Sequence, residues 1–126
     1  MALTSKQDSA ELVVLSLLSE GEKYGYMLSK EAASKSDGKL RLTPGVLYPL
    51  LRDLETQGLI TSSWEEVRSE RNERGGGDED GEGRKRKWYR LSSKGKKRLA
   101  QSIAAHRAYR ALIDAFIGRP GEKETT

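Results

Sequence analysis

The sequence predicts a mainly α-helical domain with a small β-ribbon, in the order of a winged helix-turn-helix with a long helix at the C-terminus. Three observations support this prediction. Residues 44–57 carry helically spaced leucines between a helix-start and a helix-stop signal. Two later segments are rich in β-branched and aromatic residues, and apolar residues then recur at spacings of three and four over residues 99–116. A length of 126 residues predicts one folded domain.

The composition favours a polyanionic partner and does not support catalysis. Lysine and arginine total 23 against 19 aspartates and glutamates, which gives a formal net charge of +4. The chain has no cysteine and its only histidine is His106, so we expect no metal site, no cofactor and no enzymatic activity. No cationic segment followed by a long apolar core opens the chain, and the apolar run at residues 12–18 is far shorter than a membrane span. We therefore expect a cytoplasmic protein without a membrane partner.

The first helix is expected where residues 12–18 form a nearly continuous apolar run. Such a run suits either a buried helix or a buried strand. Asp8 and Ser9 are suitable caps, and Glu11 is favourable in a first helical turn, so we predict a helix. Residues 19–22, with the sequence Ser-Glu-Gly-Glu, are expected to end it.

A second helix is expected from Tyr24 to about Lys35, because apolar residues recur every four positions along it. A glycine inside a helix costs about 1 kcal/mol relative to alanine. We therefore interpret Gly25 as a position where a neighbouring helix approaches closely. Residues 36–38 are typical of a turn, and residues 40–42, Leu-Arg-Leu, alternate like a very short strand.

The third helix is the most informative segment of the chain. Thr43 can cap free amide groups with its hydroxyl, and Pro44 at the first helical position loses no hydrogen bond. Gly58 ends the helix. One apolar stripe at i, i+3, i+4 and i+7 predicts burial of this face and comprises Leu47, Leu50, Leu51 and Leu54. The opposite face and its flank carry Gly45, Tyr48, Pro49, Arg52 and Thr56.

Two strands are predicted at residues 59–64 and 87–91. Trp64 and Trp88 are expected to face each other across the resulting ribbon as a cross-strand aromatic pair. The sequence order of helices and ribbon is that of a winged helix.

Residues 66–86, between these strands, have few apolar side chains and are expected to form a mobile wing insert. Acidic residues at 78–82 precede a basic run at 84–87, so the charges of the insert are segregated. We interpret the acidic residues as a solvated spacer. The alternative is an intramolecular mimic of DNA that competes for the basic run.

A final helix is expected from a cap at Ser92 or Ser93 to about Ile117. Its long apolar seam needs a partner surface, and a second copy of the chain is the simplest partner. We therefore interpret residues 92–117 as a C-terminal dimerisation helix and residues 118–126 as a disordered tail. The residues expected at the dimer interface are Leu12, Leu15, Leu99, Ile103, His106, Tyr109, Ile113 and Phe116.

Several of these segments match a known family in order and spacing. They are Leu17-Leu18, the Tyr-Gly-Tyr of residues 24–26, LTPGVLYPLL at 42–51, LETQGLI at 54–60 and WYRLSSKG at 88–95. Over residues 11–117 the chain resembles the PadR family of bacterial transcriptional regulators, in its short subtype with one dimerising helix. The resemblance implies a homodimer that places one recognition helix per subunit in successive major grooves and lays its wings along the flanking DNA backbone. Most members of the family are repressors.

The resemblance implies that residues 1–91 form a winged-helix DNA-binding domain for double-stranded DNA. Gly45 lets a phosphate approach the start of the third helix, Tyr48 can donate to a phosphate oxygen, and Arg52 can fork onto guanine. Pro49 deletes the bond to the Gly45 carbonyl and is expected to bend the first turns. The basic run of the wing is expected to contact phosphates. The expected DNA-binding residues are Tyr26, Lys30, Thr43, Gly45, Tyr48, Pro49, Arg52, Arg84, Lys85, Arg86 and Lys87.

The resemblance also implies a small-molecule effector, since family members are often released from DNA by aromatic or cationic compounds. In one branch the ligand lies between tryptophans of the last helix. This chain has Tyr109 and Phe116 there instead, and they are the expected ligand residues. The competing hypothesis is a winged-helix protein-interaction module that binds no specific DNA.

Overall fold

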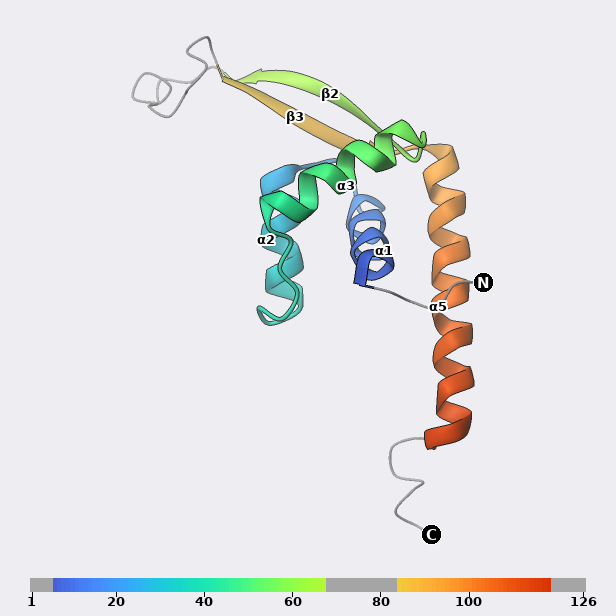
Figure 1. Ribbon diagram of the computed structural model, residues 1–126. Helices are drawn as coiled ribbons and strands as arrows, with labels where there is room; N and C mark the ends of the chain where they lie inside the picture. The colour runs from blue at the N-terminus through green and yellow to red at the C-terminus, as the bar shows by residue number, and fades with distance from the viewer. Residues whose placement is uncertain (1–5, 68–83, 119–126) are drawn as a thin grey trace.

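The computed structural model describes residues 6–67 and 84–118 of the chain. Three helices lie beside the base of a β-ribbon, and a long last helix stands at one side of them (Figure 1). In chain order the elements are α1 (Lys6–Leu18), β1 (Lys23–Tyr24), α2 (Gly25–Lys35), α3 (Pro44–Thr56), β2 (Ile60–Val67), β3 (Arg84–Leu91) and α5 (Ser93–Ile117). The predicted fold class, a winged helix-turn-helix with a C-terminal helix, is confirmed. No helix in the described ranges is both long enough and apolar enough to cross a membrane.

The core forms where the leucine stripe of α3 meets the other elements. All four predicted leucines of α3 are buried, and Leu15, Leu28 and Leu59 are completely enclosed around them. Burial of a leucine side chain contributes about 1.5–3 kcal/mol, so the stripe determines how α3 is rotated. Its opposite face is therefore turned outward. The remaining core residues are Ala10, Val14, Leu17, Leu18, Ala32, Leu42, Ile60, Tyr89, Leu91 and Leu99.

The predicted caps of α1 are wrong, and the predicted cap of α3 has the right position but lacks the side-chain hydrogen bond. Helix α1 begins at Lys6, so Asp8 and Ser9 lie inside it, because the preceding lysine and glutamine are good helix formers that extend the helix. Thr43 precedes α3 as expected, but its side chain makes no capping hydrogen bond. Its carbonyl oxygen instead accepts from the amides of Val46 and Leu47, at 2.9 and 2.7 Å. Pro49 lies inside α3, which continues through it to Thr56.

The predicted strand at residues 40–42 is absent, and a strand that the sequence did not predict takes its place in the sheet. β1 pairs antiparallel with β3, which gives the order β1-β3-β2. Side chains satisfy the backbone of residues 40–42: the Ser36 hydroxyl accepts from the Leu40 amide at 2.7 Å, and the Ser29 hydroxyl donates to the Leu42 carbonyl at 3.0 Å. Leu42 is buried without belonging to a strand.

The ribbon of β2 and β3 extends further than predicted, into both ends of the expected wing insert. Glu65 pairs with Arg86 and Glu66 with Lys85, so an acidic strand lies against a basic one. Opposite charges on facing strand positions are favourable, which explains why these polar residues form strands. The rest of the insert, residues 68–83, and the tail beyond residue 118 lie outside the described residues.

The expected contact between Trp64 and Trp88 is wrong. The register places Trp64 opposite Lys87 and Trp88 opposite Ser63. Because successive strand residues point to opposite faces, the two indoles lie on different faces of the ribbon. Trp88 packs instead edge-on against Tyr24 of β1, with ring centroids 5.0 Å apart.

Helix α5 is attached to the domain by its first turns. Ser92 is the N-cap, and its hydroxyl accepts from the Gly95 amide at 2.9 Å. Arg98 forms an ion pair of 2.8 Å with Glu11 of α1, and Leu99 is buried beside it. The last turns of α5 extend beyond the other helices (Figure 1), and Leu112, Phe116 and Ile117 there are exposed.

Substitution of Gly95 by alanine should destabilise the fold by about 1–3 kcal/mol, because a Cβ atom at Gly95 would overlap the backbone carbonyl of Leu59. Denaturant unfolding measures this loss. Gly45→Ala is the matched control, since nothing lies within 4 Å of a Cβ there and the variant should stay within about 1 kcal/mol of the parent. Equal stability of the two variants would contradict this account of the packing of α5.

Candidate nucleic-acid interface

The outward face of α3 is accessible along its whole length. Thr43, Gly45, Pro49 and Arg52 are exposed, and Tyr48 exposes 43% of its surface. Apart from Thr43, which is the N-cap, these residues were predicted on the face opposite the leucines or on its flank. The structure therefore leaves a helix surface with aromatic, small and cationic side chains open to a partner.

Tyr48 is held in place by the start of α2. Its hydroxyl occupies the space in which a Cβ of Gly25 would lie. The close approach that the sequence predicted at Gly25 is thus confirmed, and the approaching group is a side chain of α3. Any residue other than glycine at this position would have to displace the Tyr48 ring.

A hollow of about 380 Å³ separates the outward face of α3 from the ribbon, and we call it the α3–wing hollow. It is lined by Tyr48, Arg52, Glu55, Trp64, Lys87 and Tyr89. Strand alternation explains which ribbon residues reach it, since Trp64, Lys87 and Tyr89 share the face of the ribbon that lies toward α3. The sequence predicted three of the six lining residues as DNA contacts, namely Tyr48, Arg52 and Lys87.

Glu55 joins α3 to the ribbon inside this hollow. Its carboxylate accepts a hydrogen bond of 2.6 Å from the Ser62 hydroxyl and lies 3.8 Å from the Lys87 ammonium. Lys87 also lies over the rings of Trp64 and Tyr89, 5.4 and 5.7 Å from their centroids. Burial is the main cause that raises the pKa of Tyr89, and the nearby Tyr48 and Glu55 raise it further. The phenol of Tyr89 therefore stays neutral.

The predicted basic run of the wing is divided between two faces of the ribbon. Lys85 is exposed, on the same face as Lys87. Arg86 lies on the other face, where its guanidinium is 4.4 Å from the centroid of the Tyr24 ring. The side chain of Arg84 lies outside the described part of the structure.

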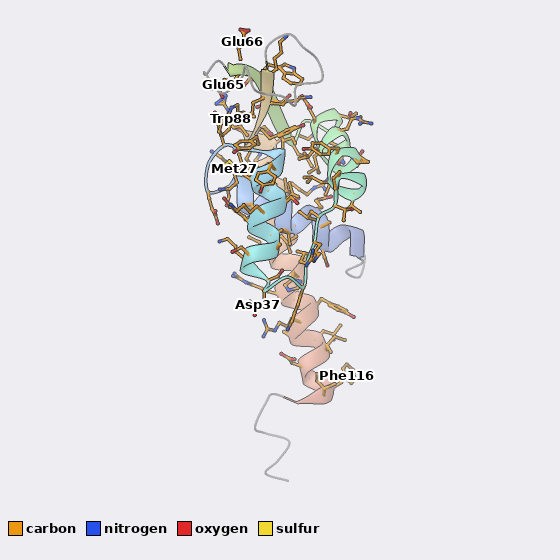
Figure 2. All side chains as sticks on the ribbon, turned by 90° about the vertical axis from the view of Figure 1, so that its left-hand side faces the viewer. Met27, Asp37, Glu65, Glu66, Trp88 and Phe116 are labelled. Carbon is orange, nitrogen blue, oxygen red and sulfur yellow. The ribbon has the colours of Figure 1, made fainter. Side chains whose placement is uncertain are left out.

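The acidic partners of this run are a feature that sequence reasoning missed. Figure 2 shows Glu65 and Glu66 on the ribbon, above Trp88. Glu66 lies opposite Lys85, and Glu65 accepts a hydrogen bond from the Trp88 indole. Trp64, Glu65 and Glu66 each lie directly opposite a basic residue of β3. This pairing could be recognised only once the strand register was known.

Tyr26 and Lys30 of α2 are also exposed. Tyr26 exposes 64% of its surface, and the Lys30 ammonium lies 6.0 Å from the centroid of its ring. The pair is available to a partner that carries negative charge.

The residues predicted at a dimer interface fall into two groups. Leu15 and Leu99 belong to the core of a single chain, with 0% and 8% exposure, so the expectation that they face a second copy is corrected. Their side chains already pack among the other core residues, so almost none of their surface is left for a partner. Leu12 and Ile103 are half-buried at the edge of the same core.

The second group lies on the last turns of α5. His106 and Phe116 are exposed, and Tyr109 and Ile113 are half-buried. Phe116 is far from the ribbon in Figure 2. Sequence reasoning missed Leu112 in this group, although its spacing from Tyr109 and Phe116 places it on the same side of the helix.

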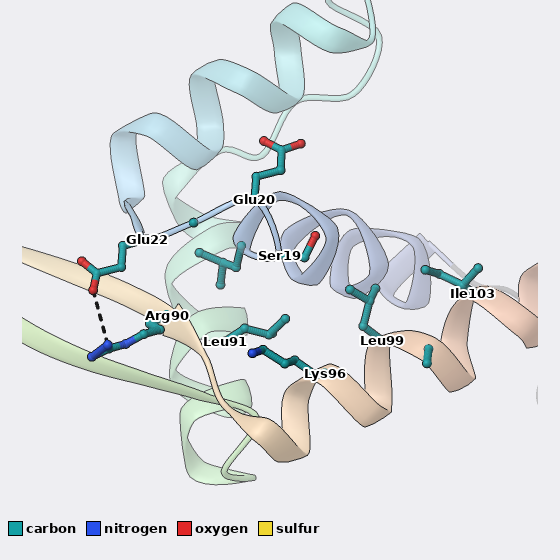
Figure 3. Close-up of a pocket in the computed structure, with 11 residues that line it drawn as sticks. Ser19, Glu20, Glu22, Arg90, Leu91, Lys96, Leu99 and Ile103 are labelled. Atoms are coloured by element: carbon teal, nitrogen blue, oxygen red, sulfur yellow. Dashed lines mark ion pairs between the residues drawn. The ribbon is translucent and has the colours of Figure 1, made fainter.

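Two further hollows lie away from the α3–wing hollow. One of about 500 Å³ lies between the end of α1, β3 and the first turns of α5, beside an ion pair of 3.5 Å between Glu22 and Arg90 (Figure 3). The other, of about 680 Å³, is lined by side chains that include Leu40, Val46 and Leu50. Neither Tyr109 nor Phe116, the expected ligand residues, lines any of these three hollows. In the described ranges, no group of three or more histidine and acidic side chains could hold a metal ion.

The chain is similar to regulators of transcription in sequence and structure. The family model described as "Transcriptional regulator PadR-like family" matches residues 14–101. The transcriptional regulator YqjI of Escherichia coli K12 is 42% identical over 55 residues, which cover 44% of this chain and 27% of that one.

Solved structures cover nearly the whole chain. A transcriptional regulator from Clostridium thermocellum, Cth-833, superposes with a TM-score of 0.71 at 26% identity, over 88% of this chain and 95% of that one. A PadR family transcriptional regulator from Eggerthella lenta DSM 2243 superposes with a TM-score of 0.65 at 30% identity, over 92% of this chain and 84% of that one. The match therefore includes α5 as well as the winged-helix part.

Replacement of Glu55 by glutamine should destabilise the protein by about 1 kcal/mol, because the neutral amide oxygen is a weaker acceptor for the Ser62 hydroxyl than the carboxylate and the ion pair with Lys87 is lost. The shift of the urea unfolding midpoint measures this effect. Asp53→Asn removes the same charge from an exposed position of α3 and should change stability by less than about 0.5 kcal/mol. If the two variants unfold at the same urea concentration, Glu55 does not join α3 to the ribbon.

Proposed function

The chain belongs to the PadR-like family of transcriptional regulators, and from this premise we propose that it is a homodimeric repressor that binds a palindromic operator. The observation that carries the proposal is the outward face of α3, where Tyr48 and Arg52 are exposed beside the ribbon. A helix turned outward by its buried leucines suits insertion into the major groove. A bacterial repressor acts on the chromosome, so the protein would work in the cytoplasm.

Each group on α3 suits a different contact with DNA. Arg52 carries a guanidinium whose paired N–H groups fit the O6 and N7 atoms of guanine. Tyr48 can donate its hydroxyl to a phosphate, and Gly45 leaves open space at the N-terminus of α3, where a negative charge is favoured. In this proposal Arg52 reads sequence, and the other two groups set the position of the helix on the duplex.

The wing supplies fewer phosphate contacts than its basic run alone would suggest. In the described part of the ribbon, Lys85 is exposed and Lys87 half-buried on the face shared with α3, whereas Arg86 lies against Tyr24 on the other face. Glu66 opposite Lys85 also lowers the positive charge of the wing. We therefore expect a modest dependence of affinity on salt from this element.

The dimer is proposed to form through the last turns of α5. Leu112, Phe116 and Ile117 expose 54%, 79% and 54% of their surfaces, and Figure 1 shows that none of the helices and strands in the described residues covers this part of α5. Large apolar side chains clustered in this way gain free energy when a second copy covers them. Two copies joined here would bring two α3 helices to one duplex, as a palindromic operator requires.

An effector site belongs to the same proposal. Tyr109 and Phe116 are two helical turns apart on α5, and a planar aromatic or cationic compound could lie between them only with surface from the second copy. Binding of such a compound would act on DNA affinity through the dimer.

The main test of the proposal is recovery of the DNA that co-purifies with the protein from its own cells. A palindromic site near the protein's own gene is the expected result. Equal enrichment of all genomic sequences, with weak binding to random DNA at physiological salt, would favour the alternative, a winged-helix protein-interaction module.

Arg52→Ala should weaken operator binding by about 1–3 kcal/mol and relax sequence selectivity, because a contact with a base edge is lost. Lys85→Ala should weaken binding to all sequences alike and lower the salt dependence by about one unit of slope. Anisotropy titrations of labelled duplexes at several salt concentrations measure both effects. If Arg52→Ala bound the operator with the affinity of the parent, α3 would have to recognise the DNA sequence through a different residue.

Phe116→Asp should convert the dimer into monomers, because a carboxylate cannot be buried in an apolar interface without a large cost. Sedimentation velocity measures the change. Ala111→Asp adds the same charge at an exposed position about 140° away around α5 and should remain dimeric. A parent protein that sediments as a monomer at all concentrations would refute the proposed assembly.

A further inference from the structure

Trp64 is a large aromatic side chain that lies outside the hydrophobic core. It exposes 63% of its surface on β2, whereas Trp88 on the neighbouring strand packs against Tyr24. Burial of an indole in a partner would contribute more than burial of almost any other side chain. Its position at the α3–wing hollow places it beside the proposed reading face of α3.

We propose that the α3–wing hollow is a subsite for one stretch of the DNA sugar–phosphate backbone, in which the face of a deoxyribose packs against Trp64. The proposal rests on the proposed function and adds a contact residue outside both α3 and the basic run of the wing. The adjoining phosphate would receive hydrogen bonds from the Tyr48 hydroxyl and the Lys87 ammonium.

The charges of the hollow suit a phosphate beside an apolar sugar. Arg52 and Lys87 contribute two cations, and the one acid, Glu55, is already engaged by the Ser62 hydroxyl and Lys87. The ammonium of Lys87 has three donors, and Glu55 lies 3.8 Å away, so donors remain for a phosphate oxygen. Because a DNA backbone alternates anionic phosphates with less polar sugars, a phosphate would lie near Arg52 and Lys87 and the neighbouring sugar against Trp64.

The indole is held ready for such a contact. Lys87 lies directly across the ribbon from Trp64, and its ammonium lies 5.4 Å from the centroid of the indole ring. This attraction restricts the side chain before DNA arrives, which lowers the entropy lost on binding. Contact with a deoxyribose also needs no unstacking of a base, so the duplex stays paired.

The two tryptophans of the chain make the proposal directly measurable. Trp88→Phe leaves Trp64 as the only indole, and Trp64→Phe leaves only Trp88. Duplexes that tile the promoter of the protein's own gene, and a random duplex at low salt, serve as probes, and the anisotropy of a dye on the DNA reports binding independently of tryptophan. On binding, the emission of Trp64 should shift to shorter wavelength and become protected from acrylamide, whereas that of Trp88 should stay unchanged.

Affinity gives a second measurement. Trp64→Ala should weaken binding to the promoter duplexes about tenfold, since the apolar contact is lost, while its thermal unfolding stays like that of the parent. Ser63→Ala is the matched control, because Ser63 is an exposed neighbour on the opposite face of the ribbon and its loss should leave affinity unchanged.

The outcomes separate this proposal from the proposed function. If dye anisotropy shows binding while Trp64 emission is unchanged, or if Trp64→Ala binds as tightly as the parent, the subsite is refuted and the repressor stands. If neither the parent nor any variant binds a duplex, both are refuted.

Discussion

The whole structure depends on the burial of one leucine stripe on α3. Leu47, Leu50, Leu51 and Leu54 can be removed from water only if α3 turns this side toward α1 and α2. The opposite side must then face outward, whatever residues it carries. Tyr48 adds a second constraint, because its hydroxyl fits against Gly25 at the start of α2. The rotation of α3, and with it the exposure of Arg52, follows from packing on its far side.

The ribbon divides its residues by a different rule, the alternation of strand side chains. Trp64 and Lys87 lie toward α3, whereas Trp88 and Arg86 lie toward Tyr24. Adjacent basic residues therefore have different surroundings, and a basic run in the sequence is not one basic surface. The acidic residues of β2 neutralise part of the charge of β3, so α3 carries more of the proposed recognition than the wing does.

Helix α5 combines two kinds of surface along its length. Its first turns are part of the domain core, through the Ser92 cap, the ion pair of Arg98 with Glu11 and the buried Leu99. Its last turns carry the large apolar residues Leu112, Phe116 and Ile117, which are exposed in the part of the chain that the structure describes, Phe116 most of all. The apolar seam that appears continuous in the sequence is thus shared between the core and a surface that we assign to a second copy.

The sequence alone determined the helices, the ribbon, a cap of the last helix at Ser92 or Ser93 and the outward side of α3, because these follow from local periodicity and from residues adjacent in the chain. It did not determine β1, the face on which Trp64 lies or the loss of Leu15 and Leu99 from the expected interface. Each of these depends on contacts between segments that are distant in the sequence. β1 exists because it pairs with β3, and a shift of one residue in the register of β2 and β3 would change which residues lie opposite Trp64. Leu15 and Leu99 are buried because the core of the single chain encloses them. Such contacts leave no periodic signal in the sequence, so only the tertiary structure decided them.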